Sequence, residues 1–505
     1  MVIHHSARSS RTESVPTWTP PTGSAAQIDA DKWGAPRRRR RWFDNWDPHV
    51  RRAAKFLIAV LALTPLFALL ARQFPEIVFD PWIMLYGFAV LSSTIYAFVL
   101  AYARYEDPAE SRHSNHIAPL SFPPLQAVPT VSFLVAIKDE RDVIERCVRS
   151  MVESDYPGLE VIVVDDASTD GTTDGTTEIL RHLTTELNFT LIELARNVGK
   201  KNALVRGAEV ATGEVIAFTD SDCVLAPDAV RRCVAALVSE ADLGAVSGHA
   251  RALNADSTLL TKIQDTWYEG SFRVVKAAEA SVGSVTCVSG PLAVFRRDAI
   301  WNYLPAWAND RFLGGEFKFA TDRQLTGYVL GQKWRGRALK DQYPESPFVA
   351  AVDYPERKWR VGYVRSAKVW TVVPESPRAF FKQQVRWKKS FIRNLCFSGT
   401  FMWRRGLQPS VLYYGHAVWV AAAPLMAIRH MIWAPVNGLW LLTALYLGGI
   451  FIKGCAWAVA FAVDNPNSTR WRYRPLMGLI STLCLSWLLP YSLLTIRRNI
   501  WSRSL

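Results

Sequence analysis

Five long segments without a charged side chain constrain this 505-residue chain more than any other feature. Each approaches the roughly 17–25 apolar residues that a helix needs to cross a bilayer, a length that core helices of soluble proteins rarely reach without a charge. A cleavable signal peptide fits this pattern badly, because the first segment begins behind a long polar tail and a second follows soon after. The sequence therefore predicts a polytopic membrane protein. The segments are 56–71, 81–103, 411–428, 431–452 and 475–496.

Arginines beside these segments predict the orientation of the chain. The clusters at 37–41 and 51–52 precede the first segment, which favours a cytoplasmic N-terminus. Two crossings return the chain to the cytoplasm near Arg104, so the long region that follows is predicted to be cytoplasmic. Three further crossings would place the basic stretch 469–474 inside but the last arginines outside. The number of C-terminal crossings therefore stays open, since a re-entrant segment around Lys453 would change it.

Composition narrows the class further. Half of the residues are hydrophobic, which excludes a wholly disordered chain. The formal net charge is +14. The seven cysteines are scattered without a C-x-x-C pair, so neither a thiolate metal site nor a disulfide scaffold is indicated. Residues 1–50 are basic and rich in Ser, Thr and Pro, and are predicted to form a disordered tail near anionic membrane lipid. No nucleic-acid partner is expected, because no nucleic-acid-binding fold follows that tail.

Between the apolar segments, short β-type runs alternate with helical patterns. Such alternation predicts an α/β fold with a mostly parallel sheet, whose ligands bind beyond the carboxyl ends of the strands. Four carboxylates, Asp165, Asp166, Asp220 and Asp222, follow strand-like runs and are expected at those ends. The predicted strands span 130–136, 159–165, 189–193 and 214–220, and the helices between them span 142–154 and 202–211.

The pattern Asp220-Ser-Asp222, directly after an apolar run, is typical of a site where Mg²⁺ or Mn²⁺ binds diphosphate oxygens. Alone, two aspartates at this spacing more often serve a turn or a helix cap. Here Lys200 stands at a Gly-Lys turn before a helix, where its ammonium group and the backbone N–H groups suit a phosphate. Together these elements predict a site for a nucleoside diphosphate.

Two motifs further along the chain suit transfer to an acceptor. Asp322 heads a helical stretch, where a carboxylate either stabilises the helix start or acts as a general base. Gln383, Arg386 and Trp387 form a Q-x-x-R-W pattern in an amphipathic stretch just before the third apolar segment. Arginine and tryptophan there suit diphosphate binding and sugar stacking, and they equally suit an anchor at the membrane surface.

The order of these motifs resembles that of the processive family 2 glycosyltransferases, which include cellulose, chitin and hyaluronan synthases. The order runs K-D-E, V-V-D-D-A-S-T-D, N-V-G-K-K-N-A-L, D-S-D, an acid before R-x-L-T, and Q-x-x-R-W, over about residues 128–395. Finer strings are most similar to hyaluronan synthases and chitin-oligomer synthases. Two of these strings are T-C-V-S-G-P-L at 286–292 and Q-Q-V-R-W-K-K-S at 383–390.

The resemblance implies a GT-A-type α/β cytoplasmic domain flanked by transmembrane and interfacial helices. The cell membrane is the implied location, with UDP-sugars, a growing polysaccharide and membrane lipid as partners. The implied parts are the tail at 1–50, two transmembrane helices at 51–104, the glycosyltransferase domain at 105–375, interfacial helices at 376–408 and C-terminal transmembrane helices at 409–505.

The resemblance also assigns roles to individual residues. Asp322 is expected to be the catalytic base, and Asp220 and Asp222 are expected to hold Mg²⁺ or Mn²⁺. The acceptor side is expected at Cys287, Gly290, Pro291 and Leu292. Donor and nucleotide binding is expected from Lys138, Glu140, Asp165, Asp166, Lys200, Asp220, Gln383, Arg386 and Trp387.

Two positions depart from the family pattern. The family has a second acid just before the base, where this chain has Thr321. It also has an acid after the arginine that follows K-K-S, where this chain has Asn394. Fewer C-terminal spans are evident than in some members. An inactive homologue that binds a donor therefore stays open as an alternative.

The reaction that the resemblance implies is an inverting displacement, in which an acceptor hydroxyl deprotonated by Asp322 attacks the anomeric carbon of a UDP-sugar. A hyaluronan synthase-like enzyme would use UDP-GlcNAc with UDP-GlcA and extrude a β-linked polymer. The alternatives are a synthase of chitin or N-acetylglucosamine oligomers and an enzyme that transfers a single sugar. A transporter is disfavoured, because the apolar segments contain only His416, with Lys453 at a boundary.

Overall fold

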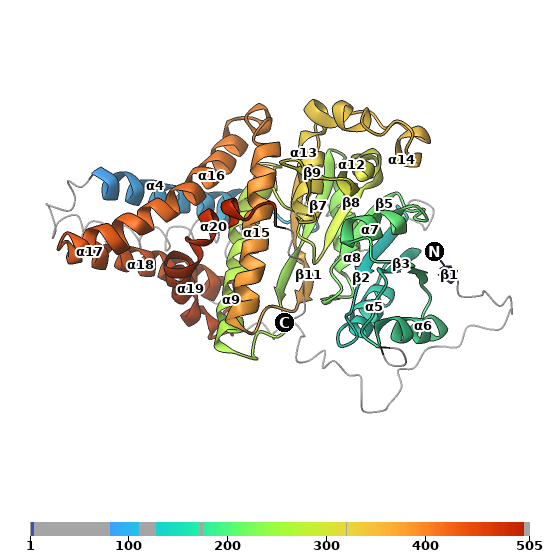
Figure 1. The fold of residues 1–505 in the computed structure, drawn as a ribbon, viewed down its shortest axis with the longest axis horizontal. Coiled ribbons are helices and arrows are strands. Elements are labelled where there is room, and N and C mark those ends of the chain that lie inside the picture. The colour runs from blue at the N-terminus through green and yellow to red at the C-terminus, as the bar shows by residue number, and fades with distance from the viewer. Residues whose placement is uncertain (1, 5–80, 111–127, 172–174, 320, 499–505) are drawn as a thin grey trace.

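The computed structural model describes residues 2–4, 81–110, 128–171, 175–319 and 321–498. The first predicted transmembrane segment, 56–71, lies outside these residues, as does all of the predicted tail except 2–4. The charged part and the apolar parts of the sequence form two different regions of the structure. The charged middle of the chain forms a domain built on a sheet, and the apolar segments form a group of helices at one end of it (Figure 1).

The charged region is built on a nine-stranded sheet, counted over the described residues, in the order β1-β4-β3-β2-β5-β8-β7-β11-β6. β2 to β5 are parallel to one another, whereas β8 runs antiparallel to both β5 and β7. The predicted parallel α/β sheet is thus confirmed for the half that carries the aspartates. The strands are β1 (Val2–His4), β2 (Val131–Ile137), β3 (Leu159–Asp165), β4 (Thr190–Glu193), β5 (Val215–Thr219), β6 (Cys223–Leu225), β7 (Leu243–Ala252), β8 (Ala293–Arg296) and β11 (Arg360–Thr371).

The register of the central strands brings their carboxyl ends to one edge. Ile137 of β2 pairs with Asp165 of β3, and Val135 of β2 pairs with Thr219 of β5. Every residue of β2 and β5 is buried, as expected for uninterrupted apolar strands that are covered on both faces. Consequently Lys138 and Asp220, which follow β2 and β5, begin loops at the same edge of the sheet.

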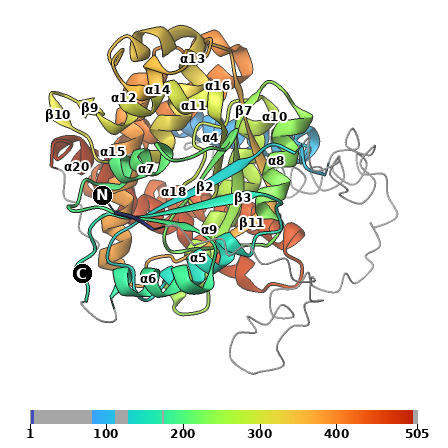
Figure 2. The ribbon, with the colours of Figure 1, turned by 90° about the vertical axis from the view of Figure 1, so that its right-hand side faces the viewer.

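Helices cover both faces of this half of the sheet. α7 packs against β2 and β3 on one side, with α12 and α13 beyond it, whereas α5 and α6 pack together on the other side (Figure 1, Figure 2). α8 packs against β7 and β11. These helices are α5 (Ile144–Val152), α6 (Thr176–Glu186), α7 (Lys200–Ala208), α8 (Ala229–Ser239), α12 (Leu304–Ala308) and α13 (Thr321–Lys340).

Two further helices lie between the sheet and the apolar helices (Figure 1). α9 (Leu259–Gly270) contacts β7 on one side and α18 and α19 on the other. α15 (Pro377–Ser398) contacts α13 and α20. α15 begins where its sequence predicts, because Ser376 accepts a hydrogen bond from the Ala379 N–H at 3.3 Å and proline occupies the first helical position.

Among the described residues, three apolar helices are long enough to cross a membrane: Leu85–Arg104, Leu407–Val436 and Trp440–Asp464. The pair Arg470–Leu485 and Leu488–Leu494, bent by 41°, would be a fourth crossing if it forms one broken span. These helices are α4 (Pro81–Val99) with the π-helical turn Leu100–Arg104, α16 (Leu407–Ile428) with α17 (Ala434–Val436), α18 (Trp440–Asp464), and α19 (Arg474–Ile480) with α20 (Leu488–Leu494).

The predicted boundaries of the segment 431–452 are wrong. A turn at 437–439, with Gly438 at φ +74°, ends one helix, and α18 begins at Trp440 and continues to Asp464. Uncharged composition alone cannot show this turn, because Asn437 and Gly438 are also tolerated within apolar runs. As a result Lys453, expected at the boundary of a span, lies inside α18.

Buried polar contacts join the ends of the apolar helices to the sheet domain. Asp464, the last residue of α18, accepts a hydrogen bond from the Tyr102 hydroxyl at 2.7 Å and pairs with Arg273 at 3.0 Å. The Tyr105 hydroxyl donates to the Tyr363 carbonyl of β11 at 2.9 Å. These contacts fix the N-terminal and C-terminal apolar helices against the same part of the sheet.

Candidate active site

The turn before α7 is held by a carboxylate at the end of β3. Asp166 accepts hydrogen bonds from the backbone N–H groups of Val198, at 2.6 Å, and Gly199, at 2.9 Å. Burial raises the pKa of Asp166, although these two hydrogen bonds act in the opposite direction. Gly199 has φ +85°, which glycine adopts without strain. The turn so fixed presents Lys200, whose ammonium group bonds the Asp220 carboxylate.

The neighbouring aspartate supports the adjacent loop. Asp165 accepts from the Ser168 N–H at 2.9 Å and hydroxyl at 2.6 Å, and from the Thr177 hydroxyl at 2.5 Å. Lys138 donates to the Ala167 carbonyl at 2.9 Å. Both oxygens of Asp165 thus have partners within the protein, so its carboxylate shapes the loop around the predicted nucleotide position.

Asp220 and Asp222 stand together at the end of β5. Single ligand atoms of Asp220, Asp222 and Cys223 lie within 4.8 Å of one another. Burial, and then the charge of Asp220, raises the pKa of Asp222 to about 6. Burial also raises the pKa of the Cys223 thiol, which keeps it protonated. Two close carboxylates whose mutual repulsion a cation would relieve fit a hard divalent ion, so the donor set present suits Mg²⁺ or Mn²⁺.

Asp322 lies at the start of α13, on the far side of Gly290 from Asp220. Its Oδ2 accepts from the Cys287 thiol at 3.3 Å and from the Gly290 N–H at 3.4 Å. A Cβ atom on Gly290 would lie 2.7 Å from Oδ2 of Asp220, so only glycine permits this approach. Gly290 therefore lies between the carboxylates of Asp220 and Asp222 and that of Asp322, which accepts two long hydrogen bonds.

α15 brings its Q-x-x-R-W residues to the same place. Burial lowers the pKa of Arg386, while the charges of Asp220 and Asp222 oppose that effect. The Trp387 ring lies 5.6 Å from that of Trp267 and is 39% exposed. Arg386 thus lies near the carboxylates of Asp220 and Asp222, and the ring of the neighbouring Trp387 is partly exposed to the same cavity.

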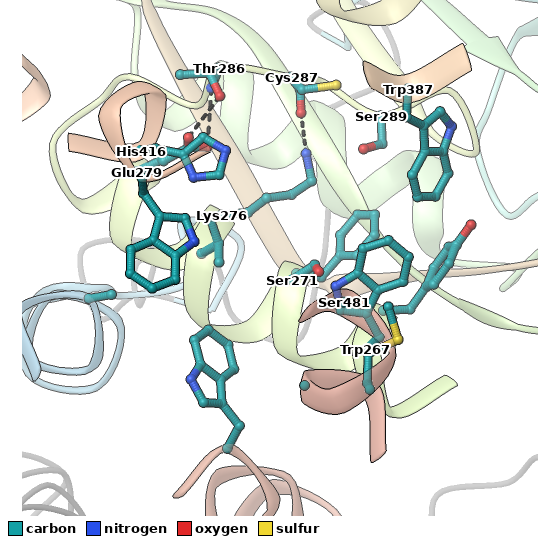
Figure 3. A pocket seen from close by; sticks show the side chains of 18 of the residues that line it. Trp267, Ser271, Lys276, Glu279, Thr286, Cys287, Ser289, Trp387, His416 and Ser481 are labelled. Carbon is teal, nitrogen blue, oxygen red and sulfur yellow. Dashed lines mark hydrogen bonds between the residues drawn. The ribbon is translucent and has the colours of Figure 1, made fainter. Parts of the chain in front are cut away.

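One cavity of about 1830 Å³ joins these groups to the apolar helices. Figure 3 shows Cys287 from the sheet domain and Trp387 from α15, together with His416 and Ser481 from the apolar helices, around this cavity. The predicted site residues that line the cavity are Glu140, Lys200, Asp220, Asp222, Cys287, Gly290, Pro291, Asp322, Gln383, Arg386 and Trp387.

Four predicted site residues do not line this cavity: Lys138, Asp165, Asp166 and Leu292. The first three form the supporting contacts described above. Leu292 is 1% exposed and packs on Gly248, where an added Cβ would lie 2.6 Å from its Cδ2 atom. Leu292 therefore fills the core beneath the cavity wall.

Residues 132–304 match the family model described as glycosyl transferase family 2. The chain carries a family 2 glycosyltransferase domain. The predicted enzyme class and fold are thereby confirmed. The matched residues include the sheet strands from β2 to β8, Asp220, Asp222 and Gly290, whereas Asp322, β11 and α15 follow them in the sequence.

The chain is similar to proteins named as N-acetylglucosaminyltransferases and as hyaluronan synthases. An N-acetylglucosaminyltransferase of Rhizobium meliloti (strain 1021) is 29% identical over 296 residues, which are 58% of this chain and 62% of the relative. A hyaluronan synthase of Streptococcus pyogenes is 28% identical over 362 residues, 70% of this chain and 78% of the relative. The chain spans between 56% and 62% of the length of the first rhizobial relatives it matches.

Among solved structures, the mannosyltransferase PcManGT from Pyrobaculum calidifontis, in complex with GDP-Man and Mn²⁺, aligns with a TM-score of 0.46 and 20% identity. The alignment covers 82% of this chain and 99% of that one.

The departure at Asn394 has a packing explanation. The Asn394 side chain lies against α13, where a Cβ on Gly327 would be 2.9 Å from its Oδ1 atom. The neighbouring Arg393 pairs with Asp310 at 2.5 Å, and Lys201 pairs with the same carboxylate at 3.2 Å. A carboxylate at 394 would be buried at this helix contact, and the arginine obtains its acid from Asp310 instead.

Sequence reasoning missed several residues at the site. The Thr371 hydroxyl donates to Asp222 at 3.2 Å, and the Tyr268 ring lies 6.2 Å from Trp387. Lys276 donates to the Cys287 carbonyl, and Glu279 accepts from the Thr286 hydroxyl at 2.7 Å (Figure 3). The adjacent aromatic pair at 267–268 in an amphipathic stretch was an available signal, whereas the others depend on contacts between distant strands and helices.

Proposed function

We propose that this chain is an inverting, processive glycosyltransferase. It polymerises UDP-sugars, UDP-GlcNAc together with UDP-GlcA, into a β-linked polysaccharide and passes the polymer through its own membrane helices. The observation that carries the proposal is the single cavity that holds Asp220, Asp222 and Asp322 and continues between the apolar helices. The resemblance to a hyaluronan synthase over 78% of that relative supports it.

The donor diphosphate would bind at the end of β5. Asp220 and Asp222 would hold Mg²⁺ or Mn²⁺, and this ion would neutralise charge on the departing diphosphate. Lys200, fixed by the turn that Asp166 supports, and Arg386 would add positive charge from two other sides. The loops after β2 and β3, with Glu140 on the cavity wall, would enclose the nucleoside.

The acceptor would lie on the side of Asp322. This carboxylate would take the proton from the acceptor hydroxyl, which attacks the anomeric carbon opposite the departing UDP and inverts its configuration. The Cys287 thiol and the Gly290 N–H donate to Oδ2 of Asp322. The Arg323 N–H, at the start of α13, donates to Oδ1 at 2.8 Å, so both oxygens of the carboxylate are oriented. Trp387 and Trp267 would stack on the acceptor sugar.

In the cell the protein would be a multi-pass membrane protein with its catalytic domain in the cytoplasm. The proposed parts are a tail at 1–50, transmembrane helices at 51–104, the catalytic domain at 105–375, interfacial helices at 376–408 and transmembrane helices at 409–505. The apolar helices of the last part and α4 support this layout by their length and composition.

The test is sugar incorporation by the purified full chain in detergent or vesicles. Labelled UDP-GlcNAc is supplied with and without UDP-GlcA, and the product is digested with hyaluronidase or chitinase. Polymer that requires both donors and yields to hyaluronidase supports the proposal, whereas chitinase-sensitive polymer from UDP-GlcNAc alone favours the N-acetylglucosamine-polymer alternative. Chelation by EDTA is expected to stop incorporation, and added Mg²⁺ or Mn²⁺ to restore it. Absence of polymer with any donor contradicts processive synthesis.

A further inference from the structure

The part of the cavity between the apolar helices has an unusual charge distribution. All acidic residues that line the cavity within the described residues come from the catalytic region: Glu140, Asp220, Asp222, Glu279, Asp322 and Glu375. The apolar helices α16 to α19 instead contribute Lys453, Arg474, His416 and His430. Ionisable side chains are costly within a membrane and commonly mark the path of a ligand.

Lys453 and Arg474 lie together where two helices cross. A Cβ on Gly454 would be 2.6 Å from the Cα of Pro475, so α18 and α19 touch directly beside both side chains. The close helix contact therefore places two like charges next to each other on the cavity wall.

Each of the two cations contacts a tryptophan ring. Lys453 Nζ lies 4.4 Å from the ring centroid of Trp419, and the Arg474 guanidinium lies 5.0 Å from that of Trp457. Within the described residues neither cation has an ion pair, and Nε of Arg474, a residue only 9% exposed, has no hydrogen-bond partner. A ring face offsets only part of the cost of removing a charge from water, so the wall lacks a counter-anion.

The pair of cations also lies beside the acceptor region. A Cβ on Gly270, the last residue of α9, would be 3.4 Å from Nε of Arg474. α9 also carries Trp267, whose ring faces Trp387. A polymer that leaves the acceptor aromatics along the cavity would therefore meet Arg474 and then Lys453.

We propose that Lys453 and Arg474 form an anion subsite for carboxylates of the growing chain, so that the polymer made here carries uronate units. The inference rests on the proposed function and names the residues that would bind the uronate carboxylates of its acidic product. Contacts to a ring face leave the cations free to exchange one carboxylate for the next. Such weak pairing suits a chain that must both enter and leave the cavity.

The test measures binding of two labelled probes to the purified full chain. One probe is a hexasaccharide of alternating GlcA and GlcNAc, and the other is the neutral β-linked GlcNAc hexamer. We expect the acidic probe to bind more tightly, with an affinity that falls as salt rises. Lys453→Met and Arg474→Gln should each weaken it by about tenfold, the loss of one charge-assisted contact, without changing binding of the neutral probe.

Two matched variants keep the test independent of folding. Lys453→Arg retains the charge and is expected to bind the acidic probe within about twofold of the unaltered chain. Arg472→Gln removes an exposed arginine two positions from Arg474 and should change nothing. Equal binding of the two probes to the unaltered chain, or an acidic-probe affinity insensitive to both neutral variants, overturns the proposal.

A lipid phosphate could present similar chemistry, so lipid binding is measured in parallel. Retention of phosphatidylglycerol by the same variants is compared in nanodiscs. Its loss from both neutral variants, with acidic-probe binding unchanged, assigns the cations to lipid and overturns the subsite.

The two proposals fail in distinguishable ways. No UDP release from any UDP-sugar contradicts the proposed function, whatever the probes do. Hyaluronidase-sensitive polymer made from both donors, together with acidic-probe binding that is insensitive to Lys453→Met and Arg474→Gln, keeps the proposed function and overturns the anion subsite.

Discussion

Buried charge is treated differently in the catalytic domain and in the wall formed by the apolar helices. In the catalytic domain, the buried cations Lys201 and Arg393 share the buried carboxylate of Asp310, so both have an anionic partner within the chain. In the wall, Lys453 and Arg474 contact aromatic faces. The difference teaches that the first set of charges stabilises the fold, whereas the second set remains available to a ligand.

The largest expected effect concerns a third kind of charge, the carboxylate of Asp322, which is the proposed catalytic base. Asp322→Asn should lower sugar transfer by about 10²–10⁴-fold, because the amide cannot accept the acceptor proton. The measurement is incorporation of labelled donor at saturating concentrations. Donor affinity should stay close to that of the unaltered chain.

The matched control for that variant is Asp341→Asn, beyond the other end of α13. Asp341 is exposed and pairs with Arg337 at 2.9 Å. Its replacement should leave transfer unchanged. Transfer that survives in Asp322→Asn would show that another group accepts the proton.

Removal of the carboxylate that Lys201 and Arg393 share tests the first set of charges. Asp310→Asn leaves Lys201 and Arg393 buried without their anion, and should cost about 3–5 kcal/mol in the free energy of unfolding. Burial already lowers the pKa of Lys201 to about 8, which shows how little of its charge is solvated. Denaturant unfolding in detergent measures the change.

Glu145→Gln provides the comparison for Asp310→Asn. It breaks an exposed pair with Arg149 and should cost at most about 1 kcal/mol. Equal effects of the two variants would mean that the buried cluster is no more important to the fold than a surface pair.

A buried histidine in β7 predicts how stability depends on pH. Burial lowers the pKa of His249 to about 4 from its ordinary value of 6.5, and its ring contacts Glu269 and Tyr363. Between these values the unfolded chain binds a proton that the folded chain does not, so stability falls as pH drops from 6.5 to 4, by about 3 kcal/mol in total. Melting temperatures at pH 7 and 4.5 should show the loss.

His249→Asn should make that acid-induced loss smaller, even though the variant is less stable at neutral pH. His182→Gln is the control, since His182 is exposed and pairs only with Glu186. An unchanged pH dependence in His249→Asn would assign the acid sensitivity to other groups.

The smallest effect concerns the aromatic faces next to the acceptor. Trp387→Ala removes contacts with Trp267 and Tyr268 and should cost about 0.5–1.5 kcal/mol of acceptor binding, seen as shorter polymers. Trp403→Ala removes an exposed tryptophan that does not line the cavity, and should leave polymer length unchanged. Equal lengths in both variants would argue against stacking on Trp387.

The catalytic half of the sheet was predictable because its strands are uninterrupted apolar runs that end in acids. The predicted strand at 159–165 coincides with β3, and those at 130–136 and 214–220 differ from β2 and β5 by one residue at the ends. The partners of the acids were not predictable. Asp165 bonds Ser168 and Thr177 close by in the chain, whereas the neighbouring Asp166 bonds the distant turn before α7. Spacing does not encode which of two adjacent carboxylates takes which partner.

The apolar helices were predictable in kind but not in their ends. Long uncharged, apolar runs identify these helices, as expected for segments that cross a membrane. A turn such as that at Gly438 does not interrupt such a run, so composition does not reveal it. The position of Lys453 beside Arg474 depends on the Gly454–Pro475 contact between α18 and α19. Such a contact follows from packing in three dimensions, which no local pattern contains.

Asp464 gives the molecule a mechanical property. It joins the end of α18 to Tyr102 near the end of the first described apolar helix and to Arg273 next to α9, so both membrane elements and the catalytic domain share one anchor. Hinge motion between them would break a buried ion pair. The protein is therefore expected to act as a rigid frame. Under the proposed function, the polymer would move along the cavity because each added sugar lengthens it at the catalytic site.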